Sequence, residues 1–270
     1  MFLLSDIIYL VAYRLLGYRK KVVRRNLAAS FPEKGEKELR RIEHRFYHHL
    51  CDLLVEGIYN LFASPRSVMK RYRVTNRELV NRYYEEGRTV VLMSAHYNDW
   101  EYMVSSLNML LLHHGIGVGK ALSNRVLEPF VLGRRQRYGT QVVYADTVRQ
   151  EVEYYHRHQV PCALMMLSDQ SPSDSRRCYW TTFLNQDTPF LYGAEHFARK
   201  YDYPVLYYRV DKLRRGRYTV TFSLLCERPS EVPQYEIVER YARQLEADIR
   251  RAPEYWLWSH RRWKHHKPEC

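Results

Sequence analysis

The stretch Val90-Val91-Leu92-Met93-Ser94-Ala95-His96-Tyr97-Asn98-Asp99-Trp100-Glu101 decides the fold of this chain. It begins as a short apolar run, which predicts a buried strand. Residues that favour turns and helix caps follow, and beyond Glu101 the apolar positions recur three and four residues apart, which predicts a helix. We therefore expect His96 at the carboxyl end of a core strand, just before a helix. In open α/β sheets, ligands bind at that edge.

Helices and apolar strands alternate from Val74 onward. After the strand at Val90, the expected strands are Val118–Leu122, Gln141–Tyr144, Cys162–Leu167, Val205–Val210 and Tyr218–Leu225. The expected helices are Glu36 to about Phe62, Glu128–Arg137, Val148–His158, Phe190–Lys200 after a Thr188-Pro189 cap, and Gln234–Arg250. This alternation predicts an α/β fold with a mixed, largely parallel sheet flanked by helices. We expect a single domain over residues 1–270, with a helical N-terminal arm (1–63) and an α/β core (64–270).

Composition restricts the class of protein and its partners. Hydrophobic residues make up 46% of the 270 residues, which excludes a disordered chain. Lys and Arg number 43 against 30 Asp and Glu, which leaves a net charge of +13. That excess favours an anionic partner, such as an anionic membrane surface, an acidic protein or a nucleic acid. Because the charge is spread along the chain and no nucleic-acid-binding module is recognisable, we expect no nucleic-acid partner.

The five cysteines (Cys51, Cys162, Cys178, Cys226 and Cys270) are odd in number and widely scattered. No C-x-x-C pair occurs among them. This usage is typical of a reducing, cytosolic setting and predicts no metal cluster.

The first residues, Met1 to Gly17, are apolar but contain Asp6 and Arg14. A membrane-spanning helix needs roughly 20 mainly apolar residues, so this segment is too short and too charged to span. Basic residues follow at Arg19, Lys20, Lys21, Arg24 and Arg25. An apolar helix with a cationic collar predicts an anchor that lies on an anionic membrane surface. An amphipathic helix packed on the domain is the alternative.

His96 and Glu101 form an H-x4-E pattern that could serve general base catalysis. If His96 lies on the turn before the helix and Glu101 on its first turn, the carboxylate can accept the Nδ1 proton and leave Nε2 free. Asp99 competes for that orienting role. Asn98 and Glu101 also fit a capping box, in which Glu101 would only cap the helix.

Four ordered stretches resemble a known family. Ser94 to Glu101 is similar to the H-x4-D/E signature of the lysophospholipid acyltransferase superfamily. Three further stretches resemble segments of the lipid A biosynthesis lauroyl/myristoyl acyltransferases, the bacterial late acyltransferases. They are the Arg-x-Arg segment in Gly133–Gly139, the Asp-Gln segment in Ser168–Pro172 and the terminal segment in Tyr255–Lys264, which ends in His-Arg-Arg-aromatic-Lys. The resemblance covers nearly the whole chain.

This resemblance implies a glycerolipid acyltransferase-like fold and an O-acyltransferase activity. A fatty acyl chain would pass from an acyl thioester, on acyl carrier protein or CoA, to a hydroxyl of a lipid A precursor or related glycolipid, without a cofactor. It implies His96 and Glu101 as catalytic residues and Arg135, Arg137, Asp169 and Gln170 as substrate-binding residues. It also implies lipopolysaccharide biosynthesis at the cytoplasmic face of the bacterial inner membrane, with acyl carrier protein, the lipid acceptor and an anionic membrane surface as partners.

Two alternatives remain open at this point. The acceptor could instead be an amino-lipid, a lysophospholipid or a secondary-metabolite lipid. Lysophosphatidate acyltransferases have a Phe-Pro-Glu-Gly-Thr segment downstream of their histidine. This sequence has no such segment after His96, which argues against glycerol-phosphate acceptors. The run Trp256–Lys264 fits either a basic-aromatic patch at a membrane interface or a packed C-terminal helix.

Because no G-x-S-x-G motif occurs, we expect direct transfer rather than an acyl-enzyme.

Overall fold

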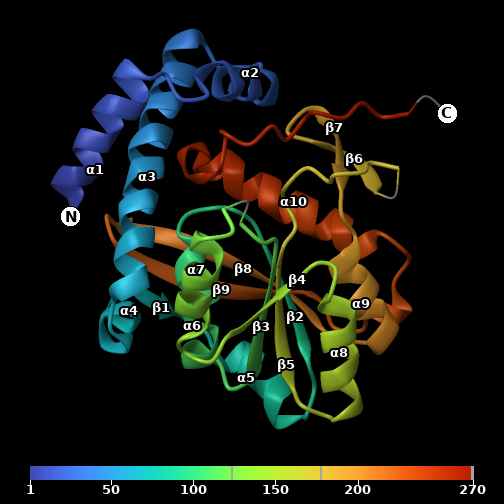
Figure 1. Ribbon diagram of the computed structural model, residues 1–270. Coiled ribbons are helices and arrows are strands. Elements are labelled where there is room, and N and C mark those ends of the chain that lie inside the picture. The colour runs from blue at the N-terminus through green and yellow to red at the C-terminus, as the bar shows by residue number, and fades with distance from the viewer. Residues whose placement is uncertain (123, 177, 269–270) are drawn as a thin grey trace.

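A seven-stranded sheet in the order β1-β9-β8-β2-β5-β3-β4 forms the centre of the protein (Figure 1). The computed structural model describes residues 1–122, 124–176 and 178–268. Neighbouring strands pair in parallel, except that β8 and β9 form an antiparallel hairpin. The mixed, largely parallel sheet predicted from the sequence is thereby confirmed.

The elements alternate along the chain as the apolar pattern predicts. The strands of the large sheet are β1 (Tyr72–Val74), β2 (Val90–Ser94), β3 (His114–Gly119), β4 (Gln141–Tyr144), β5 (Cys162–Leu167), β8 (Val205–Arg214) and β9 (Arg217–Cys226). The helices around it are α4 (Pro65–Arg71), α5 (Glu78–Glu85), α6 (Trp100–Leu110), α7 (Leu127–Gln136), α8 (Val148–Arg157), α9 (Gly193–Tyr201) and α10 (Glu236–Arg251).

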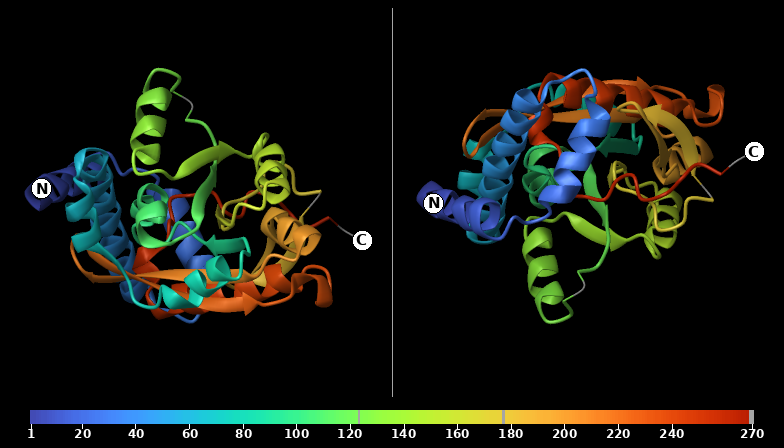
Figure 2. Two further views of the ribbon diagram at one scale, coloured as in Figure 1. Left: turned by 90° about the horizontal axis from the view of Figure 1, so that it is seen from below. Right: turned by 90° about the horizontal axis from the view of Figure 1, so that it is seen from above.

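The central strands carry apolar side chains on both faces, because helices cover both. In β2, Val91 and Met93 pack into a cluster with α8, α9 and α10, whereas Val90 and Leu92 pack into a second cluster with α4, α5 and α6. A strand buried on both faces reads as a continuous apolar run, which is why Val90–Met93 shows no alternation. Helix α7 stands away from the sheet at one side of the molecule (Figure 2).

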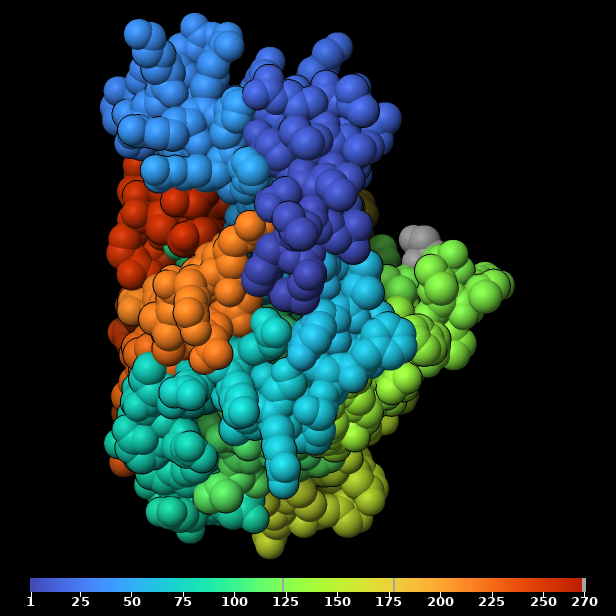
Figure 3. Space-filling view, turned by 90° about the vertical axis from the view of Figure 1, so that its left-hand side faces the viewer, coloured from blue at the N-terminus to red at the C-terminus, as the bar shows by residue number. Residues whose placement is uncertain are grey.

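The N-terminal arm consists of α1 (Phe2–Tyr9), the π-helix η1 (Leu10–Leu15), α2 (Lys20–Ser30) and the long α3 (Glu36–Phe62). The predicted bounds of α3 are confirmed. Tyr9, Tyr13 and Val23 of the arm are buried in the same cluster as the sheet residue Val91. Helix α1 lies along α3 on one side of the protein (Figure 3). Within the described residues, none of the helices combines the length and the apolar character needed to cross a bilayer.

A two-stranded hairpin replaces part of a predicted helix. We expected Thr188-Pro189 to start a helix, and this is wrong, because both residues lie in β7 (Gln186–Phe190), which pairs with β6 (Tyr179–Phe183). The turn between the strands places Leu184 and Asn185 at positive φ. Thr188 is fully buried in the hairpin, so its hydroxyl is not free to cap a helix. Helix α9 begins only at Gly193.

The C-terminal residues form neither of the two structures expected for Trp256–Lys264. After a 3-10 turn at Pro253–Tyr255 the chain is irregular, and Trp256 and Trp258 are only 2% and 0% exposed. Buried indoles cannot line a membrane interface. The Nδ2 amide of Asn26 in α2 donates to the carbonyl of Trp258, 3.0 Å away, and so ties this segment to the arm.

The cysteine side chains are dispersed through the fold. Cys51, Cys162, Cys178 and Cys226 are free thiols. Cys270 lies outside the described residues. Burial raises the pKa of the Cys162 thiol to about 12, so this thiol is a core group rather than a nucleophile.

Candidate active site

The register of two neighbouring strands brings His96 and Asp169 together. Ser94 at the end of β2 pairs with Leu167 at the end of β5, and the amide of Ser168 donates to the carbonyl of Ser94 over 3.0 Å. His96 and Asp169 each follow two residues after their strand. They therefore lie side by side at the carboxyl edge of the sheet, the edge expected for His96 from the sequence.

The imidazole of His96 is held by a buried carboxylate. Its Nδ1 atom lies 2.7 Å from Oδ1 of Asp169, while Oδ2 of Asp169 accepts from the indole Nε1 of Trp256 at 2.9 Å. Burial alone would raise the pKa of Asp169, but the charge of His96 and the hydrogen bonds from His96 and Trp256 together lower it. The carboxyl of Asp169 is therefore ionised, and it accepts a hydrogen bond from the Nδ1–H group of His96.

The other ring nitrogen of His96 is left as an acceptor. The side-chain amide nitrogen of Gln170 lies 3.0 Å from Nε2. An amide nitrogen can only donate, so Nε2 carries a lone pair in the neutral ring. The His96 side chain is 18% exposed, and its ring meets that of Trp100 edge-on at 4.9 Å. Nε2 is thus placed to accept a proton from a group arriving at this edge.

The turn that presents His96 is fixed by its own polar residues. Asn98 adopts φ +53, a left-handed conformation that Asn tolerates better than most residues. Its Nδ2 donates to the carbonyl of Val210 at 2.6 Å, and its backbone amide donates to the carbonyl of Tyr255 at 2.9 Å. These contacts hold the turn against β8 and the C-terminal segment.

Glu101 does not orient His96, which corrects our expectation. Its carboxylate instead forms a two-point ion pair with Arg135 of α7, with Nε–Oε2 at 3.0 Å and Nη2–Oε1 at 2.5 Å. Glu101 lies on the first turn of α6, from which its side chain points toward α7 rather than back toward β2. The orienting carboxylate is Asp169. The capping-box alternative is also wrong, because the N-cap of α6 is Asp99.

Arg137 contacts a different element from Arg135. Its guanidinium donates to the main-chain carbonyls of Asn60 and Leu61 at the end of α3. These carbonyls have no partner within a helix that ends at Phe62, so Arg137 satisfies them. The Arg-x-Arg segment therefore contributes one side chain to an ion pair with α6 and one to a helix terminus.

Asp99 also turns away from His96. Its Oδ1 accepts from the amide of Tyr102 at 3.3 Å, and the carboxyl group of Glu56 of α3 is close enough to act on its charge. Burial raises the pKa of Asp99 well above its usual value, and the neighbouring charge of Glu56 raises it further. Asp99 is therefore the protonated partner of the pair. Tyr218 donates its hydroxyl to Oε2 of Glu56 over 2.7 Å.

The C-terminal segment supplies site residues whose roles the sequence did not reveal. Besides Trp256, it contributes His260, whose Nε2 accepts from the amide of Ser171 at 3.0 Å, next to Gln170. Burial lowers the pKa of His260 to about 4, so its ring stays neutral. Arg262 is 1% exposed and donates to the carbonyl of Pro189 over 2.7 Å. In the sequence, these residues could be recognised only because the segment Tyr255–Lys264 resembles a segment of a known family.

The described residues offer no metal-binding group. Among residues 1–122, 124–176 and 178–268, no three His, Cys, Asp or Glu side chains are arranged to hold an ion. His44 and His48, which lie next to α1, contact Tyr9 instead: Nδ1 of His44 is 3.2 Å from its hydroxyl, and the His48 ring stacks on its ring.

Comparison with known proteins identifies the family. The family model for the bacterial lipid A biosynthesis acyltransferases matches residues 3–265, which is nearly the whole chain. Comparison with curated proteins gives no significant match. The match spans the turn with His96, the Asp169-Gln170 pair and the segment with Trp256. This chain belongs to the bacterial lipid A biosynthesis acyltransferase family.

Proposed function

We propose that this acyltransferase moves a fatty acyl chain from a thioester, carried by acyl carrier protein or CoA, to a hydroxyl of a lipid A precursor or related glycolipid. His96 is the general base. The observation that carries this proposal is the contact of 2.7 Å between Nδ1 of His96 and the buried carboxylate of Asp169, which leaves Nε2 as a partly exposed acceptor.

This geometry supports the following reaction. The acceptor hydroxyl gives its proton to Nε2 of His96, and its oxygen attacks the thioester carbonyl carbon. Asp169 stabilises the imidazolium that forms. The tetrahedral intermediate then expels the thiolate, which takes the proton back from Nε2. A positioned base of this kind contributes about 10²–10⁴ to the rate. The products are the ester and the free thiol.

The developing oxyanion needs a donor beside His96. The amide of Gln170, 3.0 Å from Nε2, is a donor at that place. The first-turn amides of α6 follow His96 directly, and the N-terminus of a helix favours negative charge. Because the substrate hydroxyl must reach Nε2, the Gln170 amide moves from the ring nitrogen to the thioester oxygen when substrate binds.

Arg135 is the side chain that we assign to the acceptor's phosphate or headgroup. The Glu101 pair fixes its guanidinium near the start of α6, and a guanidinium binds phosphate through two parallel hydrogen bonds. Glu101 then acts by positioning Arg135. The guanidinium of Arg137 is bound to main-chain carbonyls at the end of α3, so we assign the acceptor's phosphate to Arg135 alone.

The arm attaches the enzyme to the cytoplasmic face of the inner membrane. Exposed apolar side chains lie along α1 and η1 at Leu3, Leu4, Ile7, Leu10, Val11 and Leu15, and along α3 at Leu54, Ile58 and Phe62. We call these exposed side chains the apolar stripe of the arm. The ring of Phe62 lies 6.2 Å from that of Phe130 of α7, so the stripe continues onto α7. Apolar surface of this kind favours burial among lipid acyl chains.

The replacement His96→Ala tests the proposed chemistry. With purified protein, an acyl thioester and a lipid A precursor, we expect its transfer rate to fall by a factor of about 10²–10⁴ or more while its thermal unfolding is unchanged. His196→Ala, at an exposed histidine of α9, is the matched control and should keep full activity. An active His96→Ala enzyme would overturn the assignment.

Lipid mass spectrometry of a deletion strain tests the acceptor. Loss of one acyl chain from lipid A, restored by the wild-type gene but not by His96→Ala, would support the proposal. Loss of an acyl chain from an amino-lipid, a lysophospholipid or a secondary-metabolite lipid would keep the chemistry and replace the acceptor.

A further inference from the structure

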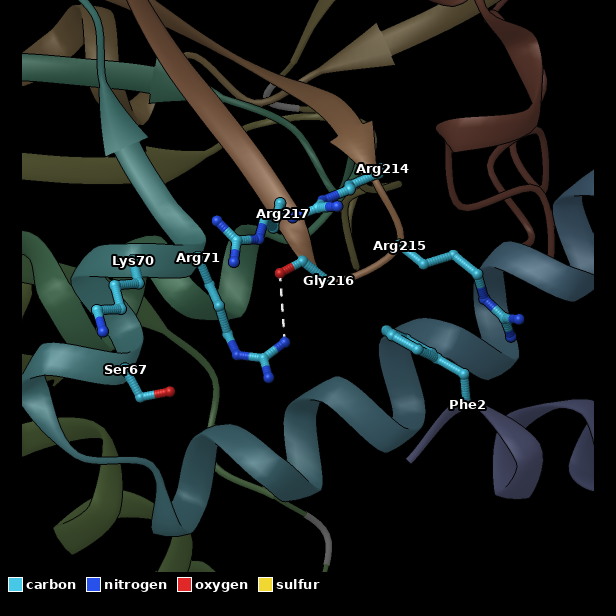
Figure 4. Close-up of a pocket in the computed structure, with 8 residues that line it drawn as sticks. All are labelled: Phe2, Ser67, Lys70, Arg71, Arg214, Arg215, Gly216 and Arg217. Atoms are coloured by element: carbon cyan, nitrogen blue, oxygen red, sulfur yellow. Dashed lines mark hydrogen bonds between the residues drawn. The ribbon is translucent and has the colours of Figure 1, made fainter.

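A pocket lined by basic side chains lies apart from His96, between the β8–β9 hairpin, α4 and the first residue of α1. Its volume is about 580 Å³, and it is lined by Phe2, Ser67, Lys70, Arg71, Arg214, Arg215, Gly216 and Arg217 (Figure 4). Pockets of this size hold small ligands or headgroups rather than a protein surface. Neither Asp nor Glu occurs among the described residues that line it.

Two of the five basic residues are built into the pocket walls. Arg215 pairs with Asp52 and Asp6 at 2.6 and 2.7 Å, so its charge is neutralised. Arg71 donates to the carbonyl of Gly216 at 3.3 Å and lies over the ring of Tyr59 at 4.4 Å. Neither contact of Arg71 is with a carboxylate, so its positive charge is not neutralised.

The remaining three, Lys70, Arg214 and Arg217, form no ion pair with any residue in the described part of the chain. Arg214 and Arg217 are also direct partners across the β8–β9 hairpin. Like charges placed opposite each other destabilise an antiparallel pair. An anion bound between them would relieve that repulsion and would therefore be held favourably.

The pocket adjoins the apolar stripe of the arm. Phe2 lines it, and Leu3, Leu4 and Ile7, which follow Phe2 on α1, are 81%, 51% and 59% exposed. In Figure 3 the hairpin (orange), the start of α1 (dark blue) and α4 (cyan) meet on the face that also carries α3. A ligand with a phosphate and acyl chains matches both parts of this surface. An acidic protein surface would leave the exposed leucines uncovered.

We propose that this pocket binds the phosphate of an anionic membrane lipid, whose acyl chains lie against the exposed apolar side chains of α1. Lys70, Arg214 and Arg217 bind the phosphate oxygens, and Phe2 marks the boundary with the acyl region. The inference rests on the membrane attachment in the proposed function but not on acyl transfer. A lipid bound here holds the protein in a fixed orientation on the membrane.

Binding of a short-chain phosphatidylglycerol, below the concentration at which it forms micelles, tests the pocket without a bilayer or a reaction. Each basic side chain at an anionic surface contributes about fivefold in affinity, so Lys70→Gln/Arg214→Gln/Arg217→Gln should weaken binding on the order of 100-fold. The matched control is Arg77→Gln/Arg149→Gln/Lys200→Gln, which removes three exposed basic side chains outside the pocket. It should weaken binding less than about threefold, because salt screens distant charges.

Thermal unfolding without ligand separates a folding defect from a binding defect. Because Arg214 faces Arg217, the triple pocket variant should unfold no earlier than wild type. The lipid should raise the unfolding temperature of wild type but not of this variant. Equal losses in pocket and control variants would assign the effect to net charge and overturn the proposal.

Three further measurements identify the occupant. Sedimentation with vesicles of phosphatidylcholine mixed with equal phosphatidylglycerol should weaken in the pocket variant, while weak binding to phosphatidylcholine alone stays unchanged. Inorganic phosphate that binds wild type as tightly as the short-chain lipid would assign the pocket to free phosphate and overturn the proposal. A pocket variant that loses binding to acyl carrier protein but keeps vesicle binding would overturn it in favour of an acidic protein.

His96→Ala should bind vesicles as wild type does, so failure of the chemistry is distinguishable from failure of the pocket.

Discussion

Nδ1 of His96 lies 2.7 Å from Oδ1 of Asp169, although 73 residues separate them in the chain. The parallel register of β2 and β5 brings about this contact, since each residue follows two positions after the paired strand ends. The imidazole tautomer thus depends on strand pairing rather than on a neighbour in the same turn. Substitutions at Asp169 should therefore affect catalysis as strongly as those near His96.

Asp169→Asn should lower the transfer rate by a factor on the order of 10²–10⁴, because an amide cannot stabilise the imidazolium and permits the wrong tautomer. The acceptor's KM should change little, since Asp169 is buried and faces the ring rather than the solvent. Steady-state kinetics with the purified variant check this. A change confined to KM would instead place Asp169 in acceptor binding.

Trp256→Phe provides a graded comparison. It removes only the indole donor to Oδ2 of Asp169 and keeps an aromatic ring in the core. One hydrogen bond to a charged group contributes about 1.5–3 kcal/mol, so we expect a loss of roughly 10- to 100-fold in rate. A Trp256→Phe enzyme less active than Asp169→Asn would show that the indole acts independently of the carboxylate.

The pair of Glu101 and Arg135 should behave as one unit. Glu101→Gln and Arg135→Gln each break a two-point ion pair whose side chains are 31% and 24% exposed. We expect each to raise the acceptor's KM and leave a fraction of the activity, and the double variant to be little worse than either alone. The double-mutant cycle should give a coupling of about 0.5–3 kcal/mol. Additive losses would mean that Glu101 acts on the substrate independently of Arg135.

Arg137→Gln should mainly affect folding. Its guanidinium satisfies the carbonyls of Asn60 and Leu61, and leaving them unpaired costs about 1–3 kcal/mol. Chemical denaturation should show this loss, while KM and turnover per folded molecule stay near wild type. A raised KM with unchanged stability would return Arg137 to the acceptor site.

Asp99→Asn should stabilise the protein increasingly as pH rises. Burial raises the pKa of Asp99 well above its value in the unfolded chain, which is about 3.9. Between those two pKa values the folded state holds a proton that the unfolded state has lost, so wild-type stability falls with rising pH. The variant removes this dependence of about 1.4 kcal/mol per pH unit, and Asn can still accept from the amide of Tyr102.

Denaturation curves between pH 5 and about pH 8 measure the difference. Asp99→Ala is the control, because it also loses the helix cap and should cost about 1 kcal/mol. A stability difference between Asp99→Asn and wild type that stays constant with pH would mean that Asp99 is ionised in the folded protein.

Exposed leucine and isoleucine side chains of the arm should carry membrane binding. Burying one such side chain contributes about 1.5–3 kcal/mol, so Leu3→Ser/Ile7→Ser/Leu10→Ser should weaken vesicle binding by at least about 100-fold. The matched control is Leu112→Ser/Leu191→Ser/Leu224→Ser, at exposed leucines outside the arm. Co-sedimentation with vesicles measures both. Equal binding of the two variants would rule out the arm as the anchor.

The elements that could be predicted from the sequence are those whose local pattern agrees with their final environment. The helix Glu36–Phe62 and the strands Gln141–Tyr144 and Cys162–Leu167 have the predicted bounds, because apolar spacing alone specifies them. The Thr188-Pro189 pair favours a helix start locally, yet pairing with β6 overrides that preference. The pairing of β7 with β6 could not be predicted from Thr188 and Pro189, because nothing in these two residues indicates it.

The site divides in the same way. His96, Asp169 and Gln170 could be placed at one sheet edge, since each follows a core strand. Which carboxylate meets the imidazole could not be predicted, because Glu101 is close in sequence and Asp169 is close only through strand register. The role of Trp256 depends on an irregular segment that crosses the fold, where no periodicity guides a prediction.

The position of Trp256 has a consequence for biosynthesis. The indole that completes the carboxylate–imidazole pair follows every strand of the sheet in the chain. A nascent polypeptide still on the ribosome can build the sheet and bring His96 beside Asp169, but it lacks this donor until translation has passed residue 256. A chain stalled or clipped before that point would lack both the donor to Asp169 and the indole of Trp258, which is fully buried in the core.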